Sequence, residues 1–217
     1  YRLLRMSEVA AAEAPGHPVA VLSGPSFAAE VAAGLPTAVV VASQQPGAAE
    51  AVQRPLATRS FRVYSSEDVV GVELGGALKN VIAIAAGIVD GMGYGHNTVA
   101  ALITRGLVEI TRRAVAEGAR PDTLAGLAGL GDLVLTCTGG LSRNRTVGAR
   151  LGQGLPLREA AAGLYPEGVR TTLAACALAE RRGIELPIAR QMKAVLYDGK
   201  PPRLAVDELM LRSLKRE

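Results

Sequence analysis

The stretch Glu73-Leu-Gly-Gly-Ala-Leu-Lys-Asn80, followed by the apolar run Val81 to Val89, places one lysine among small and apolar residues. Its spacing predicts a long helix, in which residues three, four and seven positions from Lys79 share its face. Those neighbours carry no charge: Val72, Gly75, Gly76, Ile82, Ala83 and Ala86. The helix's own face therefore offers Lys79 no charge partner.

Two interpretations of Lys79 follow from this setting. An ammonium group on an apolar face is expected to have a lowered pKa, because burial disfavours its charged form. A lysine in that state can act as a general base or acid near neutral pH. The alternative is structural: the four-carbon stem lies on apolar surface and the charged head reaches water. Spacing alone favours the structural interpretation.

The chain divides into two parts around the start of this helix. Residues 1–69 alternate short strands with helices, as in an α/β sheet, with strands expected at 19–23, 37–43 and 61–65 and helices at 1–14, 27–33 and 46–58. Residues 70–217 show helical periods and no convincing strand, with helices expected at 70–90, 97–117, 123–127, 142–152, 157–162, 168–182, 187–197 and 205–214. We therefore predict an α/β portion followed by an all-helical domain.

Composition limits the classes of function. The 217 residues are 49% hydrophobic but only 3% aromatic, with no Trp, so packing must rely on small residues and closely approaching helices. A net charge of +4 suits a small anionic ligand and is weak for a nucleic-acid-binding protein. Cys137 and Cys176 have no metal-site spacing, which favours a reducing cytoplasm and no metal. The uncharged apolar run 81–89 ends at Asp90, too short to span a membrane.

Two glycine clusters resemble nucleotide-binding loops without meeting their requirements. A dinucleotide fingerprint follows a strand directly and opens a helix, so that free backbone N–H groups meet the diphosphate. Gly91-Met-Gly-Tyr-Gly95 follows a helix, and Gly126-Leu-Ala-Gly-Leu-Gly131 lies between helical segments. We therefore expect no dinucleotide fingerprint in this chain.

Three polar motifs are candidates for chemistry. In Ser23-Gly-Pro-Ser-Phe-Ala28, at the end of the first strand, Gly24 allows close approach and the Ser26 hydroxyl can bind an anion; alternatively, Ser26 is only a helix N-cap. Asp132 and Thr136 are four residues apart and share a helix face, so Asp132 could orient a hydroxyl or hold a lysine; alternatively, it serves as a helix N-cap.

The third motif, Ser142-Arg-Asn-Arg-Thr146, combines an expected N-cap serine with two guanidinium groups and an amide at a helix start. Free N–H groups and a bidentate arginine favour a phosphate or carboxylate here. Its structural alternative is a solvated basic first turn. Positive charge at a helix N-terminus is unfavourable without an anion, however, and this favours a binding function.

Together, five motifs occur in the order found in bacterial NAD(P)-dependent glycerol-3-phosphate dehydrogenases, which this chain resembles over essentially its whole length. They are the segments 23–28, 73–80, 97–106, 126–132 and 142–145. The resemblance corresponds to the last two-thirds of the family's chain. It implies the remnant of a Rossmann domain, followed by a helical domain like the C-terminal domain of 6-phosphogluconate dehydrogenase.

The resemblance also implies the roles of individual residues. Lys79 would be the catalytic proton acceptor and donor during hydride transfer between NAD or NADP and a small phosphorylated substrate, glycerol 3-phosphate or dihydroxyacetone phosphate. Substrate contacts would come from Gly24, Ser26, Lys79, Asp132, Ser142, Arg143 and Asn144. Cofactor contacts would come from Ala28, Arg143 and Glu167, with Asn80 and Thr136 as further polar contacts. The resemblance also points to synthesis of a phospholipid precursor as the role of the reaction.

Departures from the family pattern carry further expectations. The glycine fingerprint and a second lysine expected before Tyr1 are not in the sequence, and Tyr165-Pro166 replaces an expected aliphatic pair. We therefore expect a segment to have been removed upstream, and this chain alone to bind NAD(P) poorly and turn over slowly. Tight dinucleotide binding in calorimetry would contradict this expectation.

Alternatives remain open at this point. A related 6-phosphogluconate or 3-hydroxyacid dehydrogenase would share a catalytic lysine, and a helical dimerisation or phosphate-binding module would use Lys79 only structurally. The sequence leaves undetermined the preference between NAD and NADP, since the residue that reads the ribose 2′ position lies outside this chain. It also leaves the assembly open, with a homodimer as one candidate.

Overall fold

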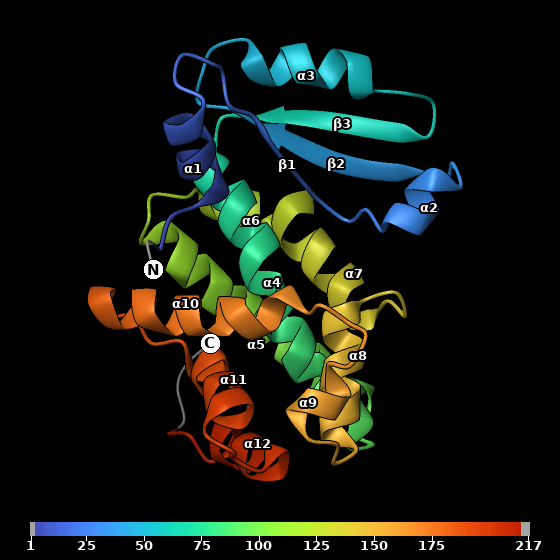
Figure 1. Cartoon of the computed structure of the whole chain (residues 1–217), viewed down its shortest axis with the longest axis vertical. Helices are drawn as coiled ribbons and strands as arrows, with labels where there is room; N and C mark the ends of the chain where they lie inside the picture. Colours follow the sequence, from blue (N-terminus) through green and yellow to red (C-terminus); the bar gives the residue numbers. More distant parts are fainter. Residues whose placement is uncertain (1–2, 214–217) are drawn as a thin grey trace.

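The computed structural model describes residues 3–213, which form a small α/β portion followed by a larger helical portion (Figure 1). This confirms the predicted fold class. The first portion comprises α1 (Met6–Glu13), β1 (Val21–Ser23), α2 (Ala28–Ala32), β2 (Thr37–Ala42), α3 (Ala48–Leu56) and β3 (Phe61–Ser66). The division between residues 69 and 70 as a domain boundary stays a prediction.

The helical portion follows β3 directly. Its elements are α4 (Val69–Gly91), α5 (His96–Val115), α6 (Pro121–Ala125), the π-helical segment η1 (Leu127–Gly131), α7 (Asp132–Thr138), α8 (Arg143–Gly152), α9 (Leu157–Ala160), α10 (Glu167–Arg182), α11 (Pro187–Tyr197) and α12 (Pro202–Met210). The last predicted helix ends earlier than expected, and its predicted final residue, Leu214, lies outside the described residues.

The sheet has the order β1-β2-β3, and its pairing differs from the parallel arrangement that strand and helix alternation suggests. β2 and β3 are parallel, but β1 is antiparallel to β2, with Ser23 opposite Val40. A parallel partner needs a crossover that returns the chain along the strand. The five-residue α2 instead lies at the end of the sheet (Figure 1). The motif after β1 therefore lies at the end of the sheet opposite to the carboxyl ends of β2 and β3.

The sheet is covered on both faces. On one face, α3 packs on an apolar cluster of Val39, Val41, Ala49 and Val63. On the other, Ala42 joins the start of α4 and the segment η1 through a second cluster, which contains Val69, Val72 and Ala128. This second cluster seats the sheet on the helical portion, so the strand ends have a defined position relative to α4.

Helix α4 is the centre of the helical portion, with most of its residues from Val69 to Val89 buried. Its length and mean hydropathy of 1.6 over an 18-residue window would suffice to cross a membrane, but 72% of that window is buried inside the fold. Asp68 begins the helix by accepting the Gly71 N–H at 2.8 Å. Helices α5, α7, α8, α10 and α11 all pack on α4, which makes it the scaffold of this part.

Helices α4 and α8 cross at backbone contact because glycines lie on both sides of the crossing. An added Cβ at Gly87 would lie 2.0 Å from the Arg145 carbonyl oxygen, and one at Gly148 would lie 2.1 Å from that of Ile84. Gly91 and Gly152 are equally confined, with nearest backbone oxygens at 2.1 and 2.3 Å. The predicted reliance on small residues and closely approaching helices is confirmed.

The opening helix is shorter than expected. Residues 3–5 are not helical and α1 begins at Met6, whereas Tyr1 and Arg2 lie outside the described residues. Arg5 has an extended backbone because it is the N-cap: its N–H donates to Glu8 Oε2 at 2.7 Å. This hydrogen bond from the N-cap N–H to the Glu8 side chain fixes the start of α1 at Met6.

A buried carboxylate joins α5 to α11. Glu109 is 4% exposed, and its two oxygens accept the N–H groups of Ile188 and Ala189, both at 2.8 Å, in the first turn of α11. Burial raises the pKa of Glu109 to about 7, although the two hydrogen bonds and the charges of Arg112 and Arg212 act in the opposite direction. Glu109 thus supplies the cap that the α11 sequence lacks.

This carboxylate makes stability depend on pH in a defined window. Since its folded pKa of about 7 exceeds the ordinary value of 4.5, the folded state binds more protons between these limits. The free energy of unfolding therefore falls as pH rises from 4.5 to 7, by roughly 3 kcal/mol from this group. We expect Glu109→Gln to remove this part of the slope in urea unfolding. Parallel profiles for the variant and the unaltered chain would contradict the prediction.

Candidate active site

Lys79 and Asp132 form an ion pair at the centre of the candidate site. Lys79 lies on α4 with 19% of its side chain exposed, and Asp132 opens α7 with 3% exposed. Lys79 therefore has a charge partner after all, contributed by another helix. The sequence interpretation in which Asp132 holds a lysine matches this contact, whereas its alternative as an N-cap is wrong because Gly131 is the N-cap.

The glycine run before Asp132 explains how α7 reaches α4. In η1, an added Cβ on Gly129 would lie 2.0 Å from the Leu124 carbonyl oxygen, so only glycine fits this compact π-helical segment. On the α4 side, an added Cβ on Gly75 would lie 2.5 Å from the Ala128 carbonyl oxygen. The run that superficially resembles a nucleotide loop therefore serves close packing, which delivers Asp132 to Lys79.

Asp132 has two hydroxyl neighbours besides Lys79. Ser23 Oγ donates to Oδ2 at 3.4 Å, and Thr136 Oγ1 lies 3.4 Å from Oδ1 and donates to the Asp132 carbonyl at 2.6 Å. Burial raises the pKa of Asp132, opposed by the charge of Lys79 and by these hydrogen bonds. The carboxylate is thus held from three sides, which fixes the direction in which it presents the Lys79 ammonium.

A second polar cluster lies next to this pair along α4. Asn144 Nδ2 donates to Asn80 Oδ1 at 3.0 Å and to Glu167 Oε2 at 3.4 Å, and Asn144 Oδ1 accepts the Gly168 N–H at 2.9 Å. Glu167 also pairs with Arg143. The side chain of Asn144, 4% exposed, is therefore occupied within the protein and ties α4, α8 and α10 together.

The start of α8 is built as the sequence predicts, with one difference in its charges. Ser142 is the N-cap, and its Oγ accepts the Arg145 N–H at 3.2 Å. The basic first turn is partly neutralised by the protein itself, because Arg143 pairs with Glu167 and Arg145 pairs with Asp90 at 2.8 Å. Within residues 3–213, the backbone N–H groups of Arg143 and Asn144 have no hydrogen-bond acceptor. These two donors remain for an anion.

The loop after β1 borders the Lys79–Asp132 pair. Gly24 has φ +141°, and its added Cβ would lie 3.0 Å from Val39 Cα, so close approach requires glycine here. Ser26 is not the N-cap of α2, which is Phe27; its Oγ donates to the Gly24 carbonyl at 3.0 Å. Pro25 Cγ lies 3.6 Å from the added Cβ of Gly131, so the loop rests on η1.

The structure brings together most of the predicted residues. Lys79, Asp132 and Thr136 form one cluster, and Asn80, Ser142, Arg143, Asn144 and Glu167 lie in or beside the second. Ala28 is exposed at the start of α2. Ser23 was not predicted as a site residue, although it is the first residue of its motif and reaches Asp132.

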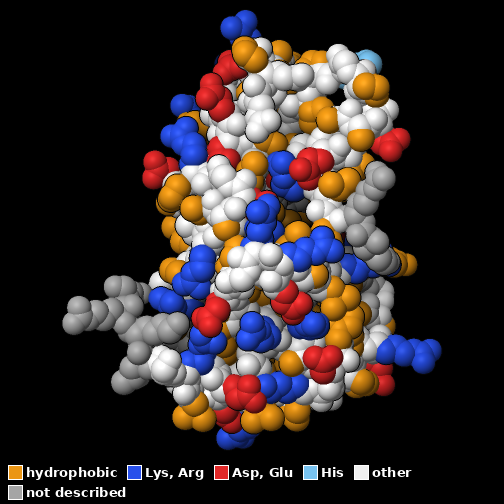
Figure 2. Space-filling view, turned by 90° about the vertical axis from the view of Figure 1, so that its left-hand side faces the viewer, with side chains coloured by type: hydrophobic (Ala, Val, Ile, Leu, Met, Phe, Trp, Pro, Cys, Tyr) orange, Lys and Arg blue, Asp and Glu red, His pale blue; other side chains and the backbone are white. Residues whose placement is uncertain are grey.

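Basic and acidic side chains share the surface of the molecule. On the face shown in Figure 2, Lys and Arg side chains are frequent around the middle and the helical end, interspersed with Asp and Glu. Among residues 3–213, no group of three His, Cys, Asp or Glu side chains could hold a metal ion. Cys137 and Cys176 are free and buried, and burial raises the pKa of Cys137 to about 12, which makes it a poor nucleophile.

Comparison with known families agrees with this geometry. Residues 68–207 match the family model described as the NAD-dependent glycerol-3-phosphate dehydrogenase C-terminus, and residues 2–49 match that of its N-terminus. The chain belongs to the NAD-dependent glycerol-3-phosphate dehydrogenase family. It is 59% identical to glycerol-3-phosphate dehydrogenase [NAD(P)+] of Geobacter sulfurreducens, over 99% of this chain and 66% of the relative.

Solved glycerol-3-phosphate dehydrogenases share the fold. The enzyme of Coxiella burnetii superposes with a TM-score of 0.93 at 47% identity, covering 97% of this chain and 65% of that one. The enzyme of Saccharomyces cerevisiae gives a TM-score of 0.83 at 28% identity, covering 93% of this chain and 62% of that one. The chain thus spans a little under two thirds of the family members that it matches.

Proposed function

We propose that the protein interconverts sn-glycerol 3-phosphate and dihydroxyacetone phosphate with NAD or NADP, supplying a precursor for phospholipids. The observation that carries the proposal is the partly accessible Lys79–Asp132 pair beside the donor-rich start of α8. Membership of the family and the name of the Geobacter relative support it. The free, buried cysteines support a cytoplasmic location.

Lys79 would carry the proton of the reaction. In reduction, Lys79 Nζ gives a proton to the substrate oxygen on C2, and in oxidation it takes that proton back. Asp132 holds Nζ in place, and Ser23 and Thr136 in turn hold Asp132. Asp132, with 3% of its side chain exposed, orients the Lys79 ammonium, and the substrate contact that the resemblance implies for Asp132 stays a prediction.

The phosphate group of the substrate would lie at the start of α8. Among the described residues, the N–H groups of Arg143 and Asn144 are unpaired there, Arg143 also brings a guanidinium group to this first turn, and the helix dipole favours an anion. Ser142 contributes by capping the helix, and Gly24 and Ser26 would close the site from the sheet side. A phosphate would compete with Glu167 for Arg143.

Residues at the edge of the site fit a dinucleotide. NAD(P), when bound, supplies or accepts the hydride at C2. The Arg143 and Glu167 side chains are about half exposed (52% and 50%), so a guanidinium donor and a carboxylate acceptor are available to a polar ligand. We propose that these two residues contact the cofactor and that Ala28 lies against it, with Asn80 as a further polar contact.

The decisive experiment is an assay of NADPH oxidation with dihydroxyacetone phosphate, on this chain and on the protein extended to the length of its relatives. We expect clear turnover with the extended protein. 6-Phosphogluconate and a 3-hydroxyacid, each offered with NADP, serve as competing substrates. Turnover of either of these substrates, but not of dihydroxyacetone phosphate, would contradict the proposal and show that the protein is a related dehydrogenase. Tight phosphate binding with no turnover of any substrate would favour a binding module.

A further inference from the structure

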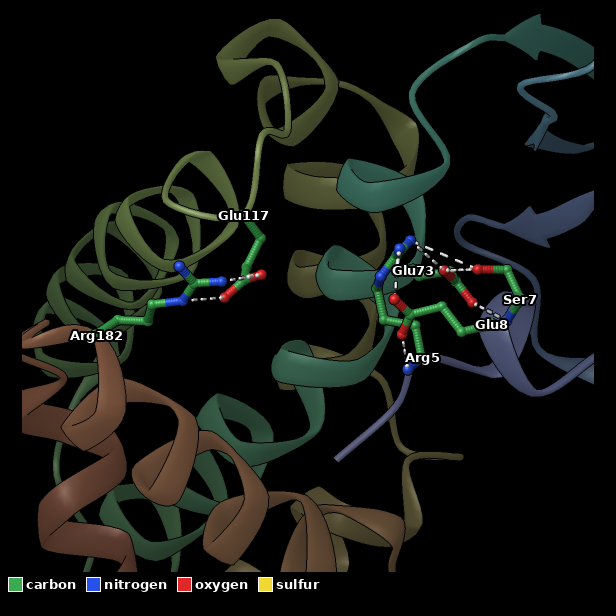
Figure 3. Close-up of polar contacts among 6 residues, drawn as sticks. All are labelled: Arg5, Ser7, Glu8, Glu73, Glu117 and Arg182. Atoms are coloured by element: carbon green, nitrogen blue, oxygen red, sulfur yellow. Dashed lines mark hydrogen bonds and ion pairs between the residues drawn. The ribbon is translucent and has the colours of Figure 1, made fainter. Parts of the chain in front are cut away.

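Glu73 stands apart from the site described above but lies on the same helix as Lys79. Its carboxylate, 10% exposed, receives three donors from the N-terminal segment. The Ser7 N–H lies 2.7 Å from Oε1, the Ser7 hydroxyl lies 2.5 Å from Oε2, and Arg5 Nη1 lies 3.0 Å from Oε2 (Figure 3). A carboxylate with three donors and little exposure forms stronger contacts than an exposed ion pair.

The segment that Glu73 holds has little else to secure it. Helix α1 buries none of its residues, so apolar packing contributes little to its position. Glu8 holds Arg5 in place through Arg5 Nη2 at 3.1 Å and through the Arg5 N–H. The Ser7 N–H belongs to the first turn of α1 and would otherwise lack an intrahelical partner. Glu73 therefore both caps α1 and attaches it to α4.

The row of α4 that contains Glu73 borders the candidate site. Residues 73, 76 and 80 recur at intervals of three and four, so they lie in one row. Gly76 faces the Ser23 hydroxyl, 2.7 Å from its added Cβ, and Asn80 binds Asn144. Seven residues of helix span about 10 Å, which places the attachment of α1 close to the site.

This attachment joins the two parts that the family comparison distinguishes. Residues 2–49 match the N-terminal family model and residues 68–207 the C-terminal one, so Glu73 bonds across the division. Gly24, Ser26 and Ala28 lie in the N-terminal part, whereas Lys79, Asp132 and Arg143 lie in the C-terminal part. The relative position of the two parts thus decides whether both sets of contacts meet one ligand.

We infer that Glu73 is a positioning residue, a latch that fixes α1 on the Lys79 helix and so adds to the apolar cluster that seats the N-terminal part of the chain there. Its effect on the site rests on the proposed function. Among the described residues, Glu73 makes no hydrogen bond or ion pair with Lys79, Asp132 or α8, so we expect their geometry to persist when the latch is lost. The loss then weakens the ligand contacts of the N-terminal part, and it weakens them equally in the substrate complex and in the transition state. KM therefore rises while kcat changes little.

The test compares Glu73→Ala and Arg5→Met with Glu117→Gln in the extended protein. Glu117 is a matched control, since it also bridges two cationic partners: Arg113 at 2.8 Å and Arg182 at 3.3 Å. Figure 3 shows Glu117 with Arg182, on a different part of the molecule from Glu73. We expect amide hydrogen exchange of residues 6–13 to accelerate about tenfold or more in Glu73→Ala, and KM to rise roughly five- to tenfold. Arg5→Met should show smaller changes in the same direction. Glu117→Gln should change neither the exchange rate of residues 6–13 nor KM.

Glu73→Gln provides a graded variant, since its amide oxygen can still accept the Ser7 N–H but does not pair with Arg5. We expect it to fall between the unaltered protein and Glu73→Ala. Unchanged exchange in Glu73→Ala would overturn the latch, whatever the activity. Faster exchange with unchanged KM would overturn the positioning role. Absence of turnover in the unaltered extended protein would refute the proposed function alone, and the exchange data would still decide the latch.

Discussion

Replacing Lys79 with alanine is expected to lower kcat/KM for dihydroxyacetone phosphate at least ~10²-fold in the extended protein. The alanine variant has no group at Nζ to exchange a proton with the substrate oxygen. It also leaves the buried Asp132 carboxylate without its cation, which costs about 3–5 kcal/mol of stability. The rate must therefore be measured on protein shown to be folded by circular dichroism.

Lys79→Arg separates the two effects. A guanidinium can keep the ion pair with Asp132, but it stays protonated and is a poor proton-transfer group. We expect this variant to retain most of the stability and still lose at least ~10²-fold in rate. Lys193→Ala, on α11 away from the site, is the matched control. A Lys79→Arg variant as active as the control would show that Lys79 is structural.

Gly148→Ala is expected to lower the free energy of unfolding by about 3 kcal/mol or more. Its new methyl group would lie 2.1 Å from the Ile84 carbonyl oxygen and 2.9 Å from Gly87 Cα. Both are backbone atoms of the central helix, so relief requires α8 to move away from α4. Such a shift would also displace the start of α8, and with it Ser142 and Arg143.

Urea unfolding of Gly148→Ala beside Gly140→Ala checks this prediction. Gly140 has no atom within 4 Å of its added Cβ and no positive φ, so its substitution should change stability by less than about 0.5 kcal/mol. Equal midpoints for the two variants would show that the crossing of α4 and α8 can relax without cost. Both variants replace a glycine with alanine, so a difference in stability between them reports the surroundings of the two glycines.

The sequence predicted the type of most elements, because their signals are local. Strand and helix periods placed β1 to β3 and most helices from α4 to α11 to within a few residues, but they gave no range for η1 and α7, whose glycine-rich sequence does not show a clear helical period. Pairing direction was not predictable in the same way: β1 is antiparallel because the short α2 turns at the end of the sheet, a property of the connection in space. The hydrogen bond from the Arg5 N–H to the Glu8 side chain shortened α1 in a comparable way.

The sequence by itself determined the central helix, the candidate lysine, the N-cap at Ser142 and the family, since each depends on residue type and spacing along one segment. Only the tertiary structure decided which side chains meet. Asp132 reaches Lys79 because glycines let η1 and α4 touch, and Glu73 reaches Ser7 across 66 residues. A contact between distant segments depends on how helices pack, and packing depends on the whole core at once.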